Sequence, residues 1–273
     1  MLMYLSMVNI LDGKSLSERL SKSLAKDVRS LGVRPKLVII QVGDMKESNS
    51  YIKKKMAFAK KVGALALHKR YPETISEREM IADIGKYNTD ESVHGIMVQL
   101  PIPKKLNSFK VVGAIVSRKD VDGLTGKSFV PATTQGILTL LEHYKAAIKG
   151  KRVVIVGDSE LVGRPTAKAL KASGASVALL SEKTANLDKK TKLADILVVA
   201  VGKPNLIGPK HVAKGQTIID VGITVKGKKV LGDVDYKNVK GLVRAITPVP
   251  GGVGPMTVYS LFENLFKAAS KRV

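Results

Sequence analysis

A length of 273 residues suggests about two domains, and a hydrophobic fraction of 44% without any tryptophan predicts substantial, mainly aliphatic cores. Cysteine is absent, which excludes disulfides, thiolate metal ligands and a cysteine nucleophile and fits a reducing, cytoplasmic location. The net charge of +23 favours acidic partners such as a phosphate-bearing cofactor or a polyanionic substrate. The lysines are scattered and there is no arginine-rich arm, so nucleic acid is the less favoured partner. The simplest explanation of the charge is solvation of the protein surface.

The start of the chain, 1–16, is apolar at first but has neither a basic leader nor a small-residue cleavage pattern. No run of the sequence approaches the roughly 20 apolar residues of a membrane span. We therefore expect no signal peptide and no membrane partner.

The first half of the chain alternates between strand-like and helix-like segments. Leucine and valine recur every fourth residue from Leu16 to Val28, as on one face of a helix. Continuous apolar runs predict buried strands over 36–42 and 94–100, and helices are predicted over 48–62 and 106–115. This alternation predicts a parallel sheet covered by helices.

The second half repeats the alternation from Gly150 onward. Strands are predicted over 152–157, 176–180, 196–202 and 217–222, with helices over 164–174 and 258–269. Alternating units of this length predict a Rossmann-like, doubly wound sheet.

We predict an α/β protein of two domains with the active site in the cleft between them. The first domain comprises 1–135, an N-terminal parallel α/β sheet, and is joined by the C-terminal helix 256–273. The second, 136–255, is a Rossmann-like domain of the type that binds dinucleotides.

Tyr51 and Lys55 are four residues apart on a predicted helix and therefore share one face. A phenol ring offers a stacking surface, and a lysine whose charge is disfavoured can act as an acid or a base near neutral pH. The alternative is that 53–55 form a solvated basic face, and the spacing does not decide between the two.

Gln99 follows a predicted strand and precedes two prolines, where α/β sheets bind ligands, although the end of a strand explains the pattern equally well. Asp120 and Asp122 lie in KDVDG with too few neighbouring carboxylates for an oxygen cage around a metal. One of them could accept two donors from a planar heterocycle, or they could form an Asx turn.

The turn 157–165 joins a strand to a helix, and its backbone N–H groups would face phosphates. Ser159 replaces the middle glycine of GxGxxG, so the match to the dinucleotide fingerprint is weak. The run 246–257 holds three prolines and three glycines, which predicts a stiff irregular loop that either lines a ligand or forms a surface turn.

In this order, and over nearly the whole chain, the motifs resemble the bifunctional methylenetetrahydrofolate dehydrogenase/methenyltetrahydrofolate cyclohydrolase family. They are YIKKK (51–55), GIMVQLPIP (95–103), KDVDG (119–123), PATTQG (131–136), GDSELVGRP (157–165), DVGI (220–223), GDVD (232–235) and PVPGGVGPMT (248–257). The resemblance implies oxidation of 5,10-methylenetetrahydrofolate with NAD(P)+, hydrolysis of the methenyl product to 10-formyltetrahydrofolate and a homodimer. It also assigns folate to the first domain and the nicotinamide dinucleotide to the second. The four histidines are scattered along the sequence, so we expect no metal site.

By this resemblance, Lys55 is the central residue of the cyclohydrolase step, Tyr51 stacks on the folate, Gln99 interacts with Lys55, and Asp122 binds the pterin ring. Further implied folate contacts are Val98, Leu100, Pro250, Gly251, Gly252, Gly254, Pro255 and Thr257. The implied cofactor contacts are Gly157, Asp158, Ser159, Gly163, Glu182 and Ile223.

The chain departs from the family at four of its positions. Ala132 and Thr134 replace the Cys and Pro of PCTP, for which we expect no loss of chemistry. Asp158 stands where the family usually has Arg, and Glu182 where it often has Ser, and both family residues face the 2′-phosphate of NADP. NADP, the family's usual cofactor, and NAD therefore both stay open. The alternative function is a catalytically weak folate- or nucleic-acid-binding protein on the same fold.

Overall fold

The computed structural model describes residues 8–227 and 229–271, so the start of the chain that bears on a signal peptide lies partly outside the described residues. The chain divides into two compact units. The six-stranded unit joins the described part of Met1–Ser17 to Thr133–Thr257, and the three-stranded unit joins Glu18–Ala132 to the described part of Val258–Val273. The fold class predicted from the sequence, α/β with two parallel sheets, is confirmed.

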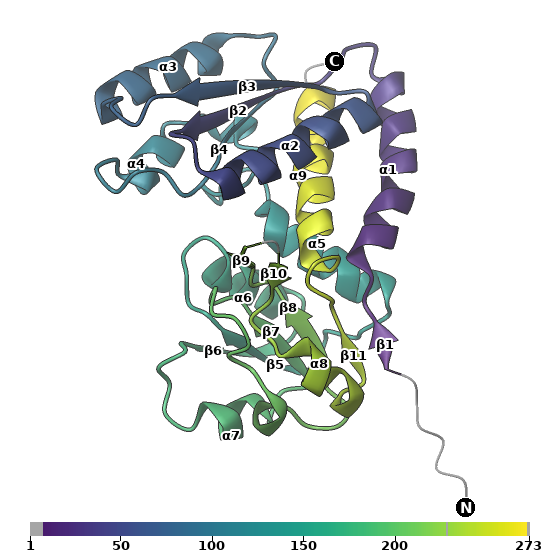
Figure 1. Ribbon diagram of the computed structural model, residues 1–273. Helices are drawn as coiled ribbons and strands as arrows, with labels where there is room; N and C mark the ends of the chain where they lie inside the picture. The colour runs from purple at the N-terminus through teal and green to yellow at the C-terminus, as the bar shows by residue number, and fades with distance from the viewer. Residues whose placement is uncertain (1–7, 228, 272–273) are drawn as a thin grey trace, which may run out of the picture. The chain divides into compact units, whose positions relative to one another are not determined.

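The three-stranded unit is built on a parallel sheet with the order β3-β2-β4 (Figure 1). Its strands are β2 (Lys36–Val42), β3 (Leu65–Tyr71) and β4 (Gly95–Val98). Its helices are α2 (Lys46–Val62), α3 (Glu77–Thr89) and α4 (Ser108–Gly113). Because β2 leads to β3 on one side and the chain returns to β4 on the other, the carboxyl ends of β2 and β4 flank a topological switch point, where open α/β sheets bind ligands.

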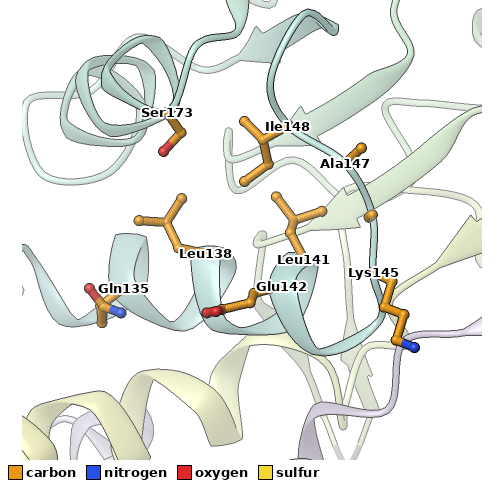
Figure 2. A pocket seen from close by; sticks show the side chains of 9 residues that line it. Gln135, Leu138, Leu141, Glu142, Lys145, Ala147, Ile148 and Ser173 are labelled. Carbon is orange, nitrogen blue, oxygen red and sulfur yellow. The ribbon is translucent and has the colours of Figure 1, made fainter.

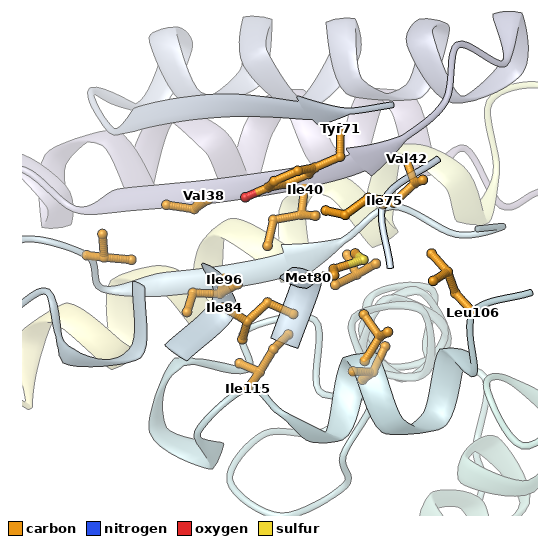
Figure 3. Close-up of a cluster of buried hydrophobic side chains, with 14 residues drawn as sticks. Val38, Ile40, Val42, Tyr71, Ile75, Met80, Ile84, Ile96, Leu106 and Ile115 are labelled. Carbon is orange, nitrogen blue, oxygen red and sulfur yellow. The ribbon is translucent and has the colours of Figure 1, made fainter. Parts of the chain in front are cut away.

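One face of this sheet packs against α3 and α4 in an aliphatic core (Figure 3). Val38, Ile40 and Val42 alternate along β2 toward that face and meet Met80 and Ile84 of α3, all of them buried. Ser76 begins α3 with a capping box, since its hydroxyl accepts from the Glu79 backbone and the Glu79 carboxylate accepts from the Ser76 backbone. The packing of this face and the cap of α3 hold the helix against the sheet before the chain enters β4.

The six-stranded unit has a fully parallel sheet with the order β1-β11-β8-β7-β5-β6. The strands are β1 (Asn9–Ile10), β5 (Arg152–Val156), β6 (Ser176–Leu180), β7 (Ile196–Val199), β8 (Thr217–Asp220) and β11 (Ala245–Ile246). An antiparallel pair, β9 (Thr224–Lys226) and β10 (Lys229–Leu231), follows β8. Here β6 and β7 lie on opposite sides of β5, so the switch point is between β5 and β7.

Short helices and three long ones complete the fold. Within the six-stranded unit are α6 (Gly163–Ala172), α7 (Leu187–Thr191) and α8 (Tyr236–Val239). The division between the units falls inside the helices α1 (Gly13–Ser30), α5 (Ala132–His143) and α9 (Val253–Ser270).

Two details differ from the sequence predictions. Residues 8–17 belong to the six-stranded unit rather than to the first domain, because β1 pairs with β11 and the Leu11 N–H donates to the Ile246 carbonyl at 2.9 Å. The helix α9 begins at Val253, inside the run predicted to be irregular. Pro255 is tolerated there because the first-turn N–H groups of a helix have no intrahelical partner.

Candidate active site

Tyr51 and Lys55 lie on one side of the helix α2, whose three consecutive lysines differ in exposure. Lys53 and Lys54 are exposed, whereas Lys55 is only 9% exposed. Lys55 is therefore not part of a solvated basic face. Tyr51 is half-buried, and the Lys54 ammonium lies over its ring, 5.5 Å from the ring centre.

Gln99 is the first residue after β4 and meets Lys55 there. The Lys55 Nζ donates to the Gln99 Oε1 at 2.8 Å, and the Gln99 Nε2 donates to the Leu100 carbonyl at 2.8 Å. The Gln99 backbone N–H donates to the Ile40 carbonyl of β2 at 2.8 Å, which fixes the residue at the switch point. Hydrogen bonds of both its backbone and its side chain thus fix the orientation of Gln99, and its Oε1 orients the Lys55 amine.

Burial lowers the pKa of Lys55, and the nearby negative charge of Asp122 opposes that shift. Burial likewise raises the pKa of Asp122 to about 6, while Lys55 lowers it and Asp120 raises it further. Burial therefore disfavours the charged form of both groups, and the opposite charge of each partly stabilises the charged form of the other. A lysine in such surroundings exchanges a proton near neutral pH far more readily than one in water.

The loop that carries Asp122 is built by its neighbours. The Asp120 carboxylate accepts from the Gly123 N–H at 3.1 Å and from the Thr125 N–H and hydroxyl at 2.7 Å each. Of the two aspartates that the sequence offered for an Asx turn, it is therefore Asp120 that forms the turn. Asp122 makes no side-chain hydrogen bond within the described chain.

Lys119 is a structural residue that the sequence did not reveal. Its side chain is fully buried, and its Nζ donates to the Tyr87 carbonyl at 2.8 Å and the Asp90 carbonyl at 2.7 Å at the end of α3. A lysine that caps a helix C-terminus satisfies carbonyls that the helix leaves open. It ties the KDVDG segment to α3, and nothing in the sequence pattern distinguishes it from an exposed lysine.

In the six-stranded unit, the turn after β5 is shaped by two glycines. Gly157 has a φ of 117°, and a Cβ on it would overlap the Ala200 carbonyl of the loop after β7. A Cβ on Gly163 would overlap the Gly157 carbonyl. The Ser159 hydroxyl accepts from the Val162 and Gly163 N–H groups at 3.3 and 3.4 Å, so it occupies donors that the sequence left for phosphates.

Glu182 lies just beyond the carboxyl end of β6, where Rossmann proteins hold the adenosine ribose. Its carboxylate pairs with the Lys203 ammonium at 3.2 Å, a partner from the loop after β7 that the sequence did not suggest. Asp158 and Ile223 are exposed. The Arg164 guanidinium, on the same turn as Asp158, pairs with Glu160 at 3.2 Å.

The glycine- and proline-rich run forms a loop over 247–252 before α9 begins. Gly251 has a φ of 116°, and its carbonyl accepts from the Lys14 N–H at 2.8 Å. A Cβ on Gly13 would overlap the Gly252 carbonyl. The close backbone approach that the glycines predicted thus includes the start of α1. Of the predicted folate contacts, Pro250 to Gly252 lie in the loop, and Gly254, Pro255 and Thr257 lie in the first turns of α9.

An open cavity of about 490 Å³ lies elsewhere in the six-stranded unit, between α5 and the segment 145–148 (Figure 2). Leu138, Leu141 and Ile148 form its apolar floor, and Glu142 and Lys145 lie at its edge. None of the predicted site residues lines it, so its size does not make it the active site.

Among the described residues, no group of three or more His, Asp or Glu side chains could hold a metal ion. None of the described helices is long and apolar enough to cross a membrane.

The architecture defines a class: a two-part α/β protein with a buried, hydrogen-bonded lysine at one switch point and a Rossmann-type glycine turn at another. The chain belongs to the tetrahydrofolate dehydrogenase/cyclohydrolase family. Residues 11–122 match its catalytic domain, and residues 131–273 match its NAD(P)-binding domain.

Known proteins of this family are similar to the chain over almost its full length. "Bifunctional protein FolD" of Bordetella petrii is 40% identical over 276 aligned residues, which cover 96% of this chain and 94% of that protein. The crystal structure of the bifunctional enzyme FolD, methylenetetrahydrofolate dehydrogenase/cyclohydrolase, from Campylobacter jejuni matches with a TM-score of 0.94 and 38% identity, covering 97% and 100% of the two chains. The Trypanosoma brucei methylenetetrahydrofolate dehydrogenase-cyclohydrolase, complexed with NADP cofactor and inhibitor, matches with a TM-score of 0.92 and 29% identity, covering 97% and 98%.

Proposed function

We propose that the protein is a bifunctional folate enzyme. It oxidises 5,10-methylenetetrahydrofolate to the 5,10-methenyl form with NAD(P)+ and then hydrolyses that product to 10-formyltetrahydrofolate. The observation that carries this proposal is the buried Lys55 amine, hydrogen-bonded to Gln99 and influenced by the Asp122 charge, in a chain that matches both domains of the family. Membership of the family also disfavours the alternative of a catalytically weak binding protein.

The hydrolysis needs a base that accepts a proton from water as its oxygen bonds to the methenyl carbon. It then needs an acid that protonates N5 as the carbon–N5 bond breaks, while the remaining hydroxyl proton is released to solvent and the formyl group stays on N10. Lys55 suits both steps, because burial favours its neutral form and a protonated amine can return the proton. Gln99 orients the amine through its Oε1. The half-buried Tyr51 ring offers a stacking face for the pterin.

Asp122 is proposed to bind the pterin rather than to transfer protons. Its carboxylate has no hydrogen-bond partner in the described chain and can accept two N–H donors from a planar heterocycle. Val98 and Leu100, which flank Gln99 at the end of β4, would line the same substrate. The residues Pro250 to Gly252, Gly254, Pro255 and Thr257 are proposed as further folate contacts on the basis of the resemblance.

The six-stranded unit fits a nicotinamide dinucleotide, because the Gly157 turn leaves no room for a side chain beside the Ala200 carbonyl at the switch point. The cofactor, when bound, accepts a hydride from the methylene carbon. Gly157, Ser159 and Gly163 would form the turn beside the pyrophosphate, Asp158 and Glu182 would face the adenosine ribose, and Ile223 would face the nicotinamide. The three-stranded unit would hold the folate. These residue roles rest on the resemblance and on positions at the carboxyl ends of the strands.

We propose NADP+ as the usual cofactor, bound through weakened 2′-phosphate contacts, with NAD+ as a competing substrate. Glu182 can accept a hydrogen bond from the 2′-hydroxyl of NAD+, and both Glu182 and Asp158 repel a 2′-phosphate. Lys203, 3.2 Å from Glu182, supplies positive charge beside the same position. Titration of the protein with each dinucleotide by calorimetry measures the balance directly.

The homodimer implied by the resemblance and the cytoplasmic location expected from the absence of cysteine are proposals of the same kind. Sedimentation of the purified protein at several concentrations tests the dimer, for which a monomer at all concentrations would be the contrary result.

The function is tested with purified protein, 5,10-methylenetetrahydrofolate and either dinucleotide. We expect reduced dinucleotide and 10-formyltetrahydrofolate to form together, the latter identified by mass spectrometry. Binding of folate without formation of either product would support the alternative of a binding protein instead.

A further inference from the structure

Two buried aspartates in the six-stranded unit take no part in the mechanism above. Asp220 ends β8 and is 3% exposed, and Asp233 follows β10 and is fully buried. They belong to the DVGI and GDVD motifs, for which only Ile223 has a proposed contact. A buried carboxyl is costly unless its oxygens are hydrogen-bonded, so each of these residues needs an explanation.

Asp220 uses both carboxylate oxygens on the backbone. Its Oδ1 accepts from the Gly222 N–H at 3.2 Å and the Asp233 N–H at 3.0 Å, and its Oδ2 accepts from the Val234 N–H at 3.0 Å. A Cβ on Gly232 would overlap this carboxylate, so the segment passes directly against it. Asp220 therefore fastens the start of the GDVD segment to the end of β8.

Asp233 extends the connection to the next strand. Its Oδ2 accepts from the Val201 N–H at 2.6 Å and from the Gly202 N–H at 2.9 Å, both in the loop after β7. Its Oδ1 is buried and has no hydrogen-bond partner among the described residues. A Cβ on Gly222 would overlap the Asp233 carboxyl, which leaves the side chain little freedom to turn.

The loop 200–203 that Asp233 holds touches every element proposed to bind the dinucleotide. The Ala200 carbonyl packs against Gly157 of the phosphate turn. The Gly202 carbonyl accepts from the Thr224 hydroxyl at 3.3 Å, next to Ile223. The Lys203 ammonium pairs with Glu182 at 3.2 Å. A shift of this loop would move the phosphate, nicotinamide and ribose contacts together.

We propose that Asp233, itself fixed by Asp220, is a positioning residue for the dehydrogenase reaction: it sets the loop 200–203 in the conformation that binds the dinucleotide, without touching the cofactor. This inference rests on the proposed dehydrogenase function. The Asp233 Oδ1 makes the proposal specific, because the two short hydrogen bonds to the loop both go to Oδ2, while the Lys203 backbone N–H lowers the pKa of the carboxyl from the same loop.

The two aspartates should therefore respond in opposite ways to the same isosteric change. Asp233→Asn can place its amide oxygen on the Val201 and Gly202 N–H groups and its NH2 where no donor lies, so the loop stays in place. Asp220→Asn must turn its NH2 against a backbone N–H in either orientation, because both oxygens of Asp220 accept. Burial raises the pKa of both carboxyls, that of Asp220 to about 7, so loss of the charge has the same direction of effect at both positions and we expect the donor pattern to separate the variants.

The test measures the dissociation constants of NADP+ and NAD+ by calorimetry in the wild type, Asp233→Asn, Asp220→Asn and Asp233→Ala. Asp235→Asn is the matched control, because this neighbouring aspartate also accepts backbone and side-chain N–H groups but caps α8. We expect binding within about threefold of wild type for Asp233→Asn and Asp235→Asn, and about 10- to 100-fold weaker binding for Asp220→Asn and Asp233→Ala. Hydrolysis of methenyltetrahydrofolate without dinucleotide should stay near wild type in all four, which a general loss of folding would not allow.

Asp220→Asn binding as tightly as Asp233→Asn would overturn the proposal, as would a parallel loss of hydrolysis and binding in Asp220→Asn. If Asp233→Ala does not fold, the contrast between the two isosteric variants still decides. A wild type that binds and reduces neither dinucleotide refutes the proposed dehydrogenase function instead, which keeps the two failures distinct.

Discussion

Replacing Lys55 by methionine removes the one group on which the proposed hydrolysis depends while nearly keeping the shape of the side chain. Lys55 is 9% exposed and donates to Gln99 at 2.8 Å. Its loss leaves the Gln99 oxygen without that donor, at a cost of about 1–3 kcal/mol, while removal of a desolvated amine offsets part of it. The variant should therefore fold, with its melting temperature lowered by a few degrees at most.

The rate should change far more than the stability. General acid–base catalysis contributes about 10²- to 10⁴-fold, which corresponds to roughly 3–5 kcal/mol of transition-state stabilisation. The assay is the decay of methenyl absorbance without dinucleotide, corrected for the uncatalysed rate. We expect a loss of about 100-fold or more in Lys55→Met.

Lys53→Met is the matched control, since Lys53 is exposed on the same helix, and it should hydrolyse the substrate at the wild-type rate. In the wild type the rate should rise with pH as the buried amine loses its proton, because burial lowers the pKa of Lys55, and Lys55→Met should lack this rise. Hydrolysis by Lys55→Met within threefold of wild type would refute the assignment of Lys55 as acid and base.

The remaining predictions concern the ligands and the charge. Asp122→Ala should raise KM for folate about 10-fold or more and weaken both activities together, because the ring's donors lose their acceptor; a loss of only one activity at unchanged affinity would contradict this role. As the pH rises from 4 to 7, Asp122→Asn should become about 1–2 kcal/mol more stable relative to wild type in denaturant titrations. The pKa of Asp122 is raised from 3.8 to about 6 in the folded protein, so its ionisation in this range destabilises the folded state, whereas an asparagine does not ionise. An equal pH profile of stability for both proteins would contradict this prediction. Asp158→Arg should tighten NADP+ binding about 10-fold with little effect on NAD+, and an unchanged NADP+ constant would show that Asp158 does not face the 2′ position. The net charge of +23 should favour a polyglutamylated folate over the monoglutamate at low salt, an advantage that shrinks with ionic strength and that equal KM values at low salt would disprove.

The strands with continuous apolar runs were predictable because burial on both faces leaves a clear signal in the sequence. The predicted strand 36–42 coincides with β2 and is buried along almost its whole length, and the buried strand β8 ends two residues before the predicted 217–222. The predicted strand 176–180 also coincides with β6, although this edge strand is only partly buried. The edge strand β3 was not predicted, since LALHKRY mixes exposed apolar and charged residues on a strand with only one neighbour. The start of α9 was missed because glycine and proline suggest a loop, although proline is compatible with a first helical turn.

Only part of the candidate site, too, could be predicted from the sequence. The motifs identified Tyr51, Lys55, Gln99 and Asp122, but their spacing could not show that Lys55 alone among its lysine neighbours is buried. The pairing of Lys203 with Glu182 joins loops that are distant in sequence, so no local pattern announces it. The partners of buried polar groups depend on which strand ends the topology brings together, and that information is three-dimensional.

In the proposed reaction sequence, one chain forms methenyltetrahydrofolate and then hydrolyses it, with Lys55 needed mainly for the second step. The decisive experiment follows reduced dinucleotide and methenyl absorbance together in one sample of 5,10-methylenetetrahydrofolate and NADP+. The wild type should produce reduced dinucleotide while little methenyl product remains, and Lys55→Met should accumulate methenyl product in nearly equal amount to the reduced dinucleotide. Absence of reduced dinucleotide with the wild type, for NAD+ as well as NADP+, or methenyl product that disappears equally fast in both proteins, would contradict the account.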